Sequence, residues 1–475
     1  MSSKRLLVVT TLLSAAALVH CSSSEDPRVS TPTDDDGGVV LDSSSAPDVL
    51  EDAAVDSSIS DAGLDGAYEV PDGAVTCSAK PCAVALSAVG TSSSTAFCVL
   101  LDDGAVHCWG SNAMGLIGVP LAEGASSTAP RRVAGVPEAK QVALGGSNGC
   151  LTAAGGGVWC WGAAALVNAA RSPEAGPPLV GAALPTQLDL VPPASNVAIG
   201  PSANARFPGT ACVTTVDGAV QCWGNNDSSQ LGPRPIANTA PPAVVPLGSS
   251  IAASVTTAGR RTFVITQEGK LLSWGRTTCN SITCRFLLGR DTSEDIAPSP
   301  SLVPELVDVR VVASGANHSC AIAGRFVECW GTNIQGGLGL GNATELSWLP
   351  QPTILATVTA EDETDAGATP RDDIPLHIGA DDLTTCAVMG SGRVYCWGDS
   401  APAETRGRPQ RVQGLSGPAV AVGVGRLTSC ALLRTGAVEC WGSNQFGALG
   451  RGVDDEALLD PKPAPVVFPD ELRDE

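Results

Sequence analysis

The chain has 475 residues, of which 43% are hydrophobic and only 4% are aromatic, and it contains 53 glycines and 35 prolines. This composition favours many short strands and turns and excludes a protein built mainly from long helices. The formal net charge of −21 argues against binding to a nucleic-acid backbone, which requires clustered lysine and arginine.

Residues 1–21 have the layout of an export signal peptide. Lys4 and Arg5 precede an apolar run at residues 6–19, which is too short to span a bilayer comfortably. Cys21 follows this run closely, and this resembles bacterial lipoprotein signals, in which the cysteine is lipidated and becomes the first mature residue. His20 departs from that pattern, because a small residue usually precedes the cysteine. We expect an exported chain, held at the bacterial outer membrane through a lipid on Cys21 only.

Residues 22–76 form an acidic segment with 14 Asp or Glu residues and a single basic residue, Arg28. A segment of this composition cannot bury enough apolar surface to offset the entropy lost on ordering. We predict a disordered tether, extended by charge repulsion, although an acidic binding tail is an alternative. The folded domain is then expected at residues 77–475.

The dipeptide Trp-Gly recurs along the predicted domain at spacings of 44 to 67 residues. It begins at Trp109, Trp161, Trp223, Trp274, Trp330, Trp397 and Trp441. A period near fifty with insertions between copies indicates a repeat architecture. Seven separate small domains are excluded, because a unit of this size cannot build its own core.

Each copy has the pattern of a β-hairpin that ends at the tryptophan. In "CVLLDDGAVHCWG" two alternating runs flank a turn at residues 102–104. A strand that enters a glycine turn precedes each hairpin, and a proline-containing apolar stretch follows it. Four short strands per repeat are typical of a propeller blade.

The stretches "CWGTNIQGGLGLG" and "CWGSNQFGALG" carry the pattern C-W-G-x-N…G-x-L-G. This pattern resembles the RCC1 (regulator of chromosome condensation) repeat over residues 83–468, and the resemblance implies an all-β, seven-bladed β-propeller. The second and sixth copies lack the Asn and the Gly-x-Leu-Gly tail. The order of strand types at the two ends predicts that one blade is completed by both termini, which would remove a sheet edge at the seam.

Sixteen cysteines other than Cys21 fall into eight neighbouring pairs. Five pairs lie ten residues apart within a hairpin: Cys98 with Cys108, Cys150 with Cys160, Cys212 with Cys222, Cys386 with Cys396, and Cys430 with Cys440. Another hairpin pair is Cys320 with Cys329, and two closer pairs are Cys77 with Cys82 and Cys279 with Cys284. Residues equidistant from a hairpin turn face each other at a distance that a disulfide bridges. In the fifth copy the turn and the cysteine spacing are both one residue shorter, so the partners stay opposite.

The fourth copy supports this pairing, because it lacks both hairpin cysteines and has Phe263 and Ser273 in their places. Losing one alone would leave a free thiol. Disulfides agree with an exported protein, since they persist in oxidising compartments. Zinc binding is the alternative, but paired C-x-x-C spacing is absent and histidine is scarce. We expect no metal and no cofactor.

Candidate chemical groups are few. His318 occupies a position of the repeat itself, and His107 lies on a strand; neither belongs to a recognisable nucleophile arrangement. The remaining folded-domain histidine is His377. The acidic run at residues 360–373 lacks the ordered spacing of a calcium loop, so a solvated insertion is favoured. Trp159 and Trp348 lie outside the repeat position, where local packing is favoured over a binding anchor.

These observations favour a non-enzymatic, monomeric binding module at the cell envelope, with a protein or a glycan as partner and no nucleic acid. The family resemblance implies an alternative, a regulator that acts in guanine-nucleotide exchange, which the export signal and the disulfides oppose. A propeller hydrolase or lyase would need clustered acid–base residues on loops at one end. A structural spacer at the cell surface is a further alternative.

Overall fold

The computed structural model describes residues 75–91, 94–120, 125–200, 209–278, 287–342, 347–355, 373–381, 383–399, 405–454 and 459–469. The chain divides into two units, Met1–Ala67 and Tyr68–Glu475, and every described residue belongs to the second. Cys21, the predicted tether up to residue 74, the expected pair of Cys279 with Cys284, and residues 360–372 of the acidic run lie outside the described residues. None of the described helices is long and apolar enough to cross a membrane.

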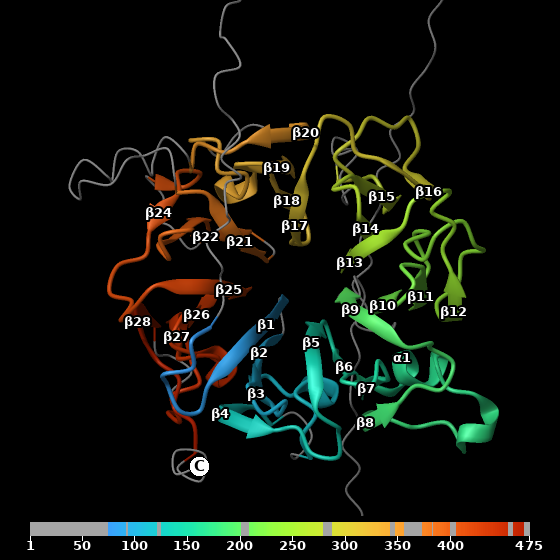
Figure 1. The fold of residues 1–475 in the computed structure, drawn as a ribbon, viewed down its shortest axis with the longest axis horizontal. Helices are drawn as coiled ribbons and strands as arrows, with labels where there is room; N and C mark the ends of the chain where they lie inside the picture. The colour runs from blue at the N-terminus through green and yellow to red at the C-terminus, as the bar shows by residue number, and fades with distance from the viewer. Residues whose placement is uncertain are drawn as a thin grey trace, which may run out of the picture. The chain divides into compact units, whose positions relative to one another are not determined.

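The described residues form seven antiparallel sheets of four strands, arranged as the blades of a β-propeller (Figure 1). Blades 1 to 3 comprise β1 (Ala83–Thr91), β2 (Ser94–Leu101), β3 (Val106–Gly110), β4 (Ser127–Arg132); β5 (Ala139–Gly145), β6 (Asn148–Ala153), β7 (Val158–Ala163), β8 (Ala182–Gln187); and β9 (Ala194–Gly200), β10 (Thr210–Thr215), β11 (Val220–Gly224), β12 (Ala240–Val244). Blades 4 and 5 comprise β13 (Ala252–Ala258), β14 (Arg261–Thr266), β15 (Leu271–Arg276), β16 (Ile296–Leu302); and β17 (Val309–Ser314), β18 (His318–Ala323), β19 (Phe326–Gly331), β20 (Ser347–Pro352). Blades 6 and 7 comprise β21 (Pro375–Ala380), β22 (Thr384–Met389), β23 (Val394–Gly398), β24 (Gln410–Arg411); and β25 (Ala419–Gly425), β26 (Thr428–Leu433), β27 (Val438–Ser443), β28 (Leu459–Pro465).

The first strand of each blade lies toward the centre of the ring and the fourth lies at its rim (Figure 1). Helical segments within the described residues are short. They are α1 (Ala164–Ala169) and 3₁₀ turns at Ala113–Gly115, Pro173–Ala175, Ile334–Gly336 and Gln445–Gly447. The expectation of an all-β, seven-bladed propeller is confirmed.

The expectation of a blade shared by both termini is wrong. Blade 1 is complete in β1–β4 and blade 7 is complete in β25–β28. At the seam the Ala83 N–H donates to the Gly436 carbonyl at 2.9 Å, and Ala139 makes the same bond to Gly104 at 2.9 Å between blades 1 and 2. The ring therefore closes by the same kind of contact that joins other neighbouring blades, so no exchanged strand is needed.

Seven hydrophobic clusters hold neighbouring blades together, one at each blade-to-blade junction. Alternation along the hairpin strands divides the side chains between two junctions. In blade 1, Cys98 and Cys108 face blade 2, where they share a cluster with Trp161. Phe97 and Trp109 of the same hairpin face blade 7. Each hairpin disulfide thus packs in the same cluster as the next blade's repeat tryptophan.

The Trp-Gly pair requires close packing at both residues. Gly110 has a φ of 96°, and a Cβ there would lie 2.4 Å from the Thr95 carbonyl oxygen, so only glycine fits. The Trp161 indole N–H donates to the Leu116 carbonyl of blade 1 at 2.8 Å. Asn112 holds that loop in shape, because its Oδ1 accepts the Ile117 N–H at 3.1 Å. The Asn and the Gly-x-Leu-Gly tail of one blade therefore build the acceptor for the next blade's tryptophan.

Blade 2 lacks that tail, and α1 takes the place of the loop. Leu166 and Val167 of α1 pack in the cluster that contains Trp223 of blade 3. The Trp223 indole nitrogen is buried and has no hydrogen-bond partner among the described residues. The helix therefore replaces the apolar packing of the lost loop but not its hydrogen bond.

Candidate functional site

The antiparallel order of the strands divides the connections between two faces of the propeller. The hairpin turns between the second and third strands share one face with the segments that join consecutive blades; we call this the turn face. The loops between the first and second strands, and between the third and fourth, lie on the opposite face, the loop face. Each face carries one feature that is a candidate for binding.

The structure contains a disulfide in the hairpin of every blade except blade 4. The bonded residues are Cys98 with Cys108, Cys150 with Cys160, Cys212 with Cys222, Cys320 with Cys329, Cys386 with Cys396, and Cys430 with Cys440. The partners lie opposite each other in register, as Cys98 and Cys108 do, with Cα atoms 4.1 Å apart. These are the six hairpin pairs that the spacing predicts.

The two closer cysteine pairs differ in what the structure describes. Cys77 is bonded to Cys82, as the spacing predicts. Cys279 and Cys284 lie outside the described residues, so their pairing stays a prediction. Cys77, Cys82 and Asp102 place potential metal ligands close together. Because both sulfurs are bonded to each other, no thiolate is available there for a metal, and the cysteines of the described residues are structural.

The three histidines of the folded domain lie in three different blades. His318 is buried in blade 5, with Nε2 2.7 Å from the Thr385 hydroxyl of blade 6. His107 is buried in blade 1, and burial lowers its pKa to about 4. Nδ1 of His377 accepts the Val422 N–H of blade 7 at 3.4 Å, and burial lowers its pKa to about 4 as well. Each histidine packs inside the propeller, so they do not form a common acid–base site.

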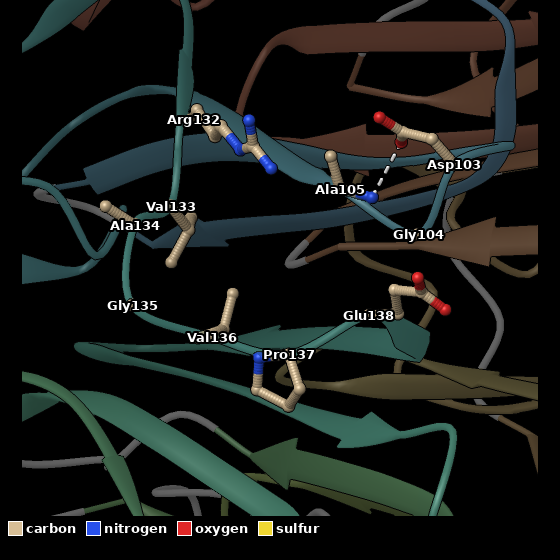
Figure 2. A pocket seen from close by; sticks show the side chains of 10 residues that line it. All are labelled: Asp103, Gly104, Ala105, Arg132, Val133, Ala134, Gly135, Val136, Pro137 and Glu138. Carbon is tan, nitrogen blue, oxygen red and sulfur yellow. Dashed lines mark hydrogen bonds between the residues drawn. The ribbon is translucent and has the colours of Figure 1, made fainter.

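A charged pocket of 290 Å³ lies on the turn face beside blade 1 (Figure 2). Its walls are the hairpin turn at residues 103–105 and the connection at residues 132–138. Figure 2 shows the carboxylates of Asp103 and Glu138 on one side and the Arg132 guanidinium on the other. Asp103 is anchored, because its Oδ1 accepts the Ala105 N–H at 2.8 Å. The pocket therefore has an acidic end and a basic end.

A second pocket of 560 Å³ lies beside blade 2 and shares Pro137 with the first. Trp159, Gln187 and Pro193 line it, together with Leu188, Asp189 and Val191. We call the two pockets together the turn-face groove. Trp159 is half-buried and packs against the core between blades 1 and 2, while it also lines the groove. The two alternatives for Trp159, packing and binding, are thus combined in one side chain.

The groove is open at blade 2 because the hairpin turn there has no side chains. Gly155 and Gly157 stand where blade 1 has Asp103 and Ala105. A Cβ on Gly155 would meet nothing within 4 Å. A Cβ on Gly157 would lie 3.5 Å from the Gln187 Nε2 and 4.0 Å from the Trp159 Nε1. The run of three glycines is the sequence signal for this opening, although by itself it indicates only a turn.

Asp189 is the acidic group nearest the tryptophan end of the groove. Its carboxylate accepts the Ser172 N–H at 2.9 Å and also the Ser172 hydroxyl. These hydrogen bonds hold the pKa of the Asp189 carboxyl below its usual value. The carboxylate is therefore charged and already has two donors. Trp348, the other tryptophan outside the repeat, lies on β20.

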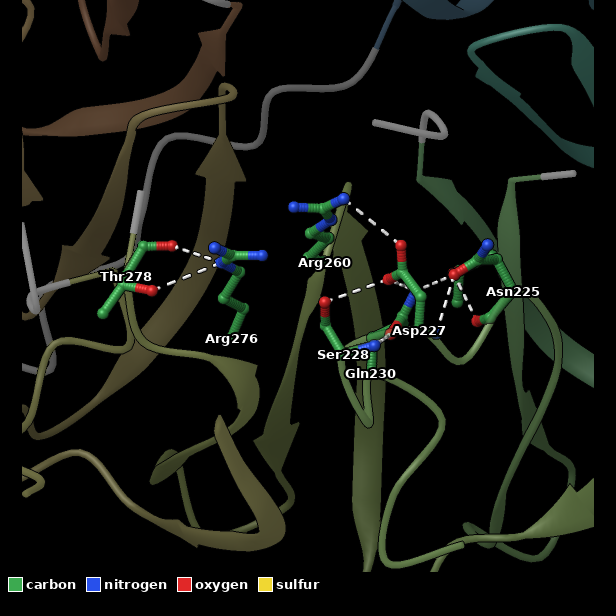
Figure 3. A network of polar contacts seen from close by, with 8 residues as sticks. Asn225, Asp227, Ser228, Gln230, Arg260, Arg276 and Thr278 are labelled. Carbon is green, nitrogen blue, oxygen red and sulfur yellow. Dashed lines mark hydrogen bonds and ion pairs between the residues drawn. The ribbon is translucent and has the colours of Figure 1, made fainter. Parts of the chain in front are cut away.

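The loop face carries a polar network between blades 3 and 4 (Figure 3). The Arg260 guanidinium lies 3.3 Å from the Asp227 carboxylate, and the Gln230 amide donates to Asn225 Oδ1 at 2.7 Å. Arg276 donates through Nε to the Thr278 carbonyl at 2.9 Å. The pair of Arg260 and Asp227 joins the two blades but is partly exposed, so it contributes at most about 1 kcal/mol. These polar groups bond to one another within the protein, which favours a structural role.

Comparison with known proteins supports the fold. A family model, Regulator of chromosome condensation (RCC1) repeat, matches residues 91–115 and 419–448. Yeast RCC1 (Prp20), solved bound to Kap60, is 20% identical, with 76% of this chain and 83% of that chain covered and a TM-score of 0.61. Prp20p from Saccharomyces cerevisiae, described with its binding to Gsp1p and histones, is 18% identical, with coverages of 76% and 85% and a TM-score of 0.60.

Human WBSCR16 is similar at 16% identity, with 77% of this chain and 94% of that chain covered and a TM-score of 0.60. At these identities the solved structures show a common fold, and the repeat match comes from the sequence itself. The repeat match and the solved structures both agree with the Trp-Gly periodicity and with the blade topology. Two segments of the chain therefore match the RCC1 repeat, and the chain is a seven-bladed β-propeller that shares its fold with these solved structures.

Proposed function

We propose that this chain is a monomeric, non-enzymatic binding module, exported and held by a lipid at the bacterial outer membrane, which presents its turn face to a partner protein or glycan. The observation that carries this proposal is the turn-face groove. It combines an exposed apolar lining with charged groups at one end and hydrogen-bonding groups at the other. Specific ligand sites generally combine these features.

Two further observations support a binding role at the envelope. Six disulfides are buried between blades, and bonds of this kind persist in oxidising compartments. Proteins that share this fold bind other proteins, since yeast RCC1 was solved with Kap60 and Prp20p is described with its binding to Gsp1p and histones. Protein binding by this chain is therefore proposed by analogy of fold.

Two other functions have less support. Guanine-nucleotide exchange rests on the family resemblance alone, and the signal-like segment at residues 1–21 opposes it. A propeller hydrolase or lyase would bring acid–base groups together, whereas His107, His318 and His377 are dispersed and buried or engaged within blades. The binding module is the function that fits the described surface.

The test is peptide mass spectrometry of protein isolated from its native host without reduction. We expect an N-terminal peptide that begins at Cys21 with the mass of a lipid attached, and six linked hairpin pairs. A reduced and alkylated sample is the control that identifies the linked peptides. Free hairpin thiols together with an unprocessed N-terminus would overturn the proposed export and anchoring.

A further inference from the structure

We propose that the turn-face groove binds an extended, proline-rich peptide segment of the partner, with a basic residue at the end that lies toward blade 1. This inference rests on the proposed binding function and names the chemistry of the ligand. It follows from three properties of the groove: its unused hydrogen-bond donors, its apolar lining and the distribution of its charges.

The tryptophan end of the groove offers two side-chain donors that the protein does not use. The Trp159 indole N–H and the Gln187 side-chain amide have no hydrogen bond to any described residue, and Gly157 leaves the space in front of both open. A proline-rich chain in the polyproline II conformation has free carbonyls and few N–H groups. Its hydrogen-bonding pattern is therefore complementary to that of this pocket.

The apolar lining suits the same ligand. Pro137, Pro193 and the half-buried indole of Trp159 border the pocket, with Leu188 and Val191 also in its lining. Proline rings pack well on aromatic and apolar surfaces, and the preformed helix loses little entropy on binding. The apolar lining of the groove therefore fits a proline-rich peptide.

The charged groups at the blade 1 end of the groove determine the orientation of the bound peptide. Asp103 and Glu138 are exposed in the pocket beyond Pro137, and Arg132 lies on its opposite wall. Two carboxylates against one guanidinium give this pocket a net negative charge, so a lysine or arginine in the ligand is favoured over an acidic residue. The proline-rich part then lies against Trp159 and the basic part against blade 1.

The experiment is isothermal titration calorimetry of the full chain, purified in detergent, with three synthetic peptides. The probes are ten prolines alone, ten prolines with two arginines at one end, and ten prolines with two glutamates at that end. We expect binding of the proline peptide, with affinity raised about threefold to tenfold by arginine at low salt and lowered by glutamate. An oligosaccharide of N-acetylglucosamine is titrated in parallel.

Three variants locate the binding. Gly157→Val places a side chain before both donors at ordinary contact distances, so the fold is expected to persist while affinity falls at least about tenfold. Trp159→Phe keeps an aromatic ring in the core and removes the indole N–H, which also weakens binding. Ala219→Val changes the equivalent turn position in blade 3, outside the groove, and should leave the affinity unchanged.

The inference is overturned if no proline peptide binds, if Gly157→Val and Trp159→Phe bind as tightly as the unmodified chain, or if the oligosaccharide binds at this site instead. These outcomes are independent of the lipid and disulfide analysis. If Cys21 is lipidated but no peptide binds, the proposed envelope location is supported and the proposed ligand is wrong. If the peptides bind but Cys21 is not lipidated, the proposed ligand is supported and the proposed location is wrong.

Discussion

In blade 4 a phenylalanine occupies the place that a hairpin disulfide fills in the other six blades. Phe263 and Ser273 lie opposite each other in register, as the cysteines do elsewhere. Phe263 packs edge-to-face on Trp330 of blade 5, with ring centroids 5.8 Å apart. In blade 3 the disulfide of Cys212 and Cys222 lies in the cluster that contains the next repeat tryptophan. The disulfide is therefore a packing element between blades as well as a cross-link within one.

Two arginines make further contacts in blade 4. Arg290 donates through Nε to the Ser273 hydroxyl at 3.1 Å. Arg261 is buried and donates to the backbone carbonyls of Ala316 at 2.9 Å and His318 at 3.1 Å, which lie in blade 5. Burial lowers the pKa of Arg261 to about 10, so it remains charged at neutral pH. The comparison teaches that an aromatic ring packed on the next blade's tryptophan can take the place of one disulfide within a ring of repeats.

The largest expected effect comes from removing the arginine that joins blades 4 and 5. Arg261→Ala leaves several buried carbonyls without their charged donor, and we expect a loss of about 3 to 5 kcal/mol in the free energy of unfolding. Urea denaturation followed by fluorescence measures this loss. The matched control is Arg260→Ala, which removes only a partly exposed ion pair and should cost under about 1 kcal/mol. Equal costs for the two variants would contradict the role of Arg261.

Removing a hairpin disulfide should have the next largest effect. For Cys212→Ala/Cys222→Ala we expect a loss of about 2 to 3 kcal/mol, because the unfolded chain is no longer constrained. The same denaturation assay under non-reducing conditions measures it. Ser273→Ala, at the position equivalent to Cys222, loses only the bond from Arg290 and should cost about 1 kcal/mol. If the double variant costs no more than Ser273→Ala, the hairpin disulfide does not stabilise its blade.

The third prediction concerns the pH dependence of stability. Blades 1 and 6 each contain a histidine whose pKa is lowered by burial, whereas blade 4 has no histidine. The folded-state pKa of His107 and of His377 is lowered to about 4, below the unfolded value of 6.5. The unfolded chain therefore binds protons first, so stability is full above about pH 6.5 and falls as the pH drops toward 4. For His107 alone we expect about 2 kcal/mol to be lost between pH 7 and pH 5.

The measurement for this prediction is the free energy of unfolding at pH 7 and at pH 5. Carboxylates also titrate over this range, so His107→Gln serves as the reference, because it removes only the histidine contribution. We expect the pH-dependent loss to be smaller in the variant. An identical loss in the two proteins would show that His107 does not contribute to acid sensitivity.

The smallest expected effect is the difference in stability between variants of two repeat tryptophans. The Trp274 indole N–H donates to the Gln230 carbonyl at 2.9 Å, whereas the Trp223 N–H has no partner among the described residues. Both Trp→Phe changes remove similar ring volume, so their difference isolates the hydrogen bond. We expect Trp274→Phe to cost about 1 kcal/mol more than Trp223→Phe in thermal or urea unfolding. Equal costs would mean that the loop acceptor does not stabilise the repeat.

The repeat number, the fold class and the hairpin disulfides were predictable from the sequence because they depend on local register. Residues at equal distances from a turn must face each other, and Cys320 stays opposite Cys329 although their turn is one residue shorter. The Trp-Gly repeats marked one blade each for a similar reason, since the tryptophan lies at the end of the second strand of each hairpin. These are properties of neighbouring residues along the chain.

The contacts between blades 7 and 1 and the residues of the turn-face groove could be identified only from the tertiary structure. Blade 7 meets the start of β1 through bonds such as that from Ala83 to Gly436, and these two residues are more than 350 positions apart in the chain. The groove brings Trp159 together with Pro137 and Gln187, which lie on different strands and connections. Contacts of this kind depend on how whole blades pack, because hydrophobic burial between sheets has no fixed spacing in sequence. The sequence by itself determined the blades, and their packing around the ring determined the surface that they present.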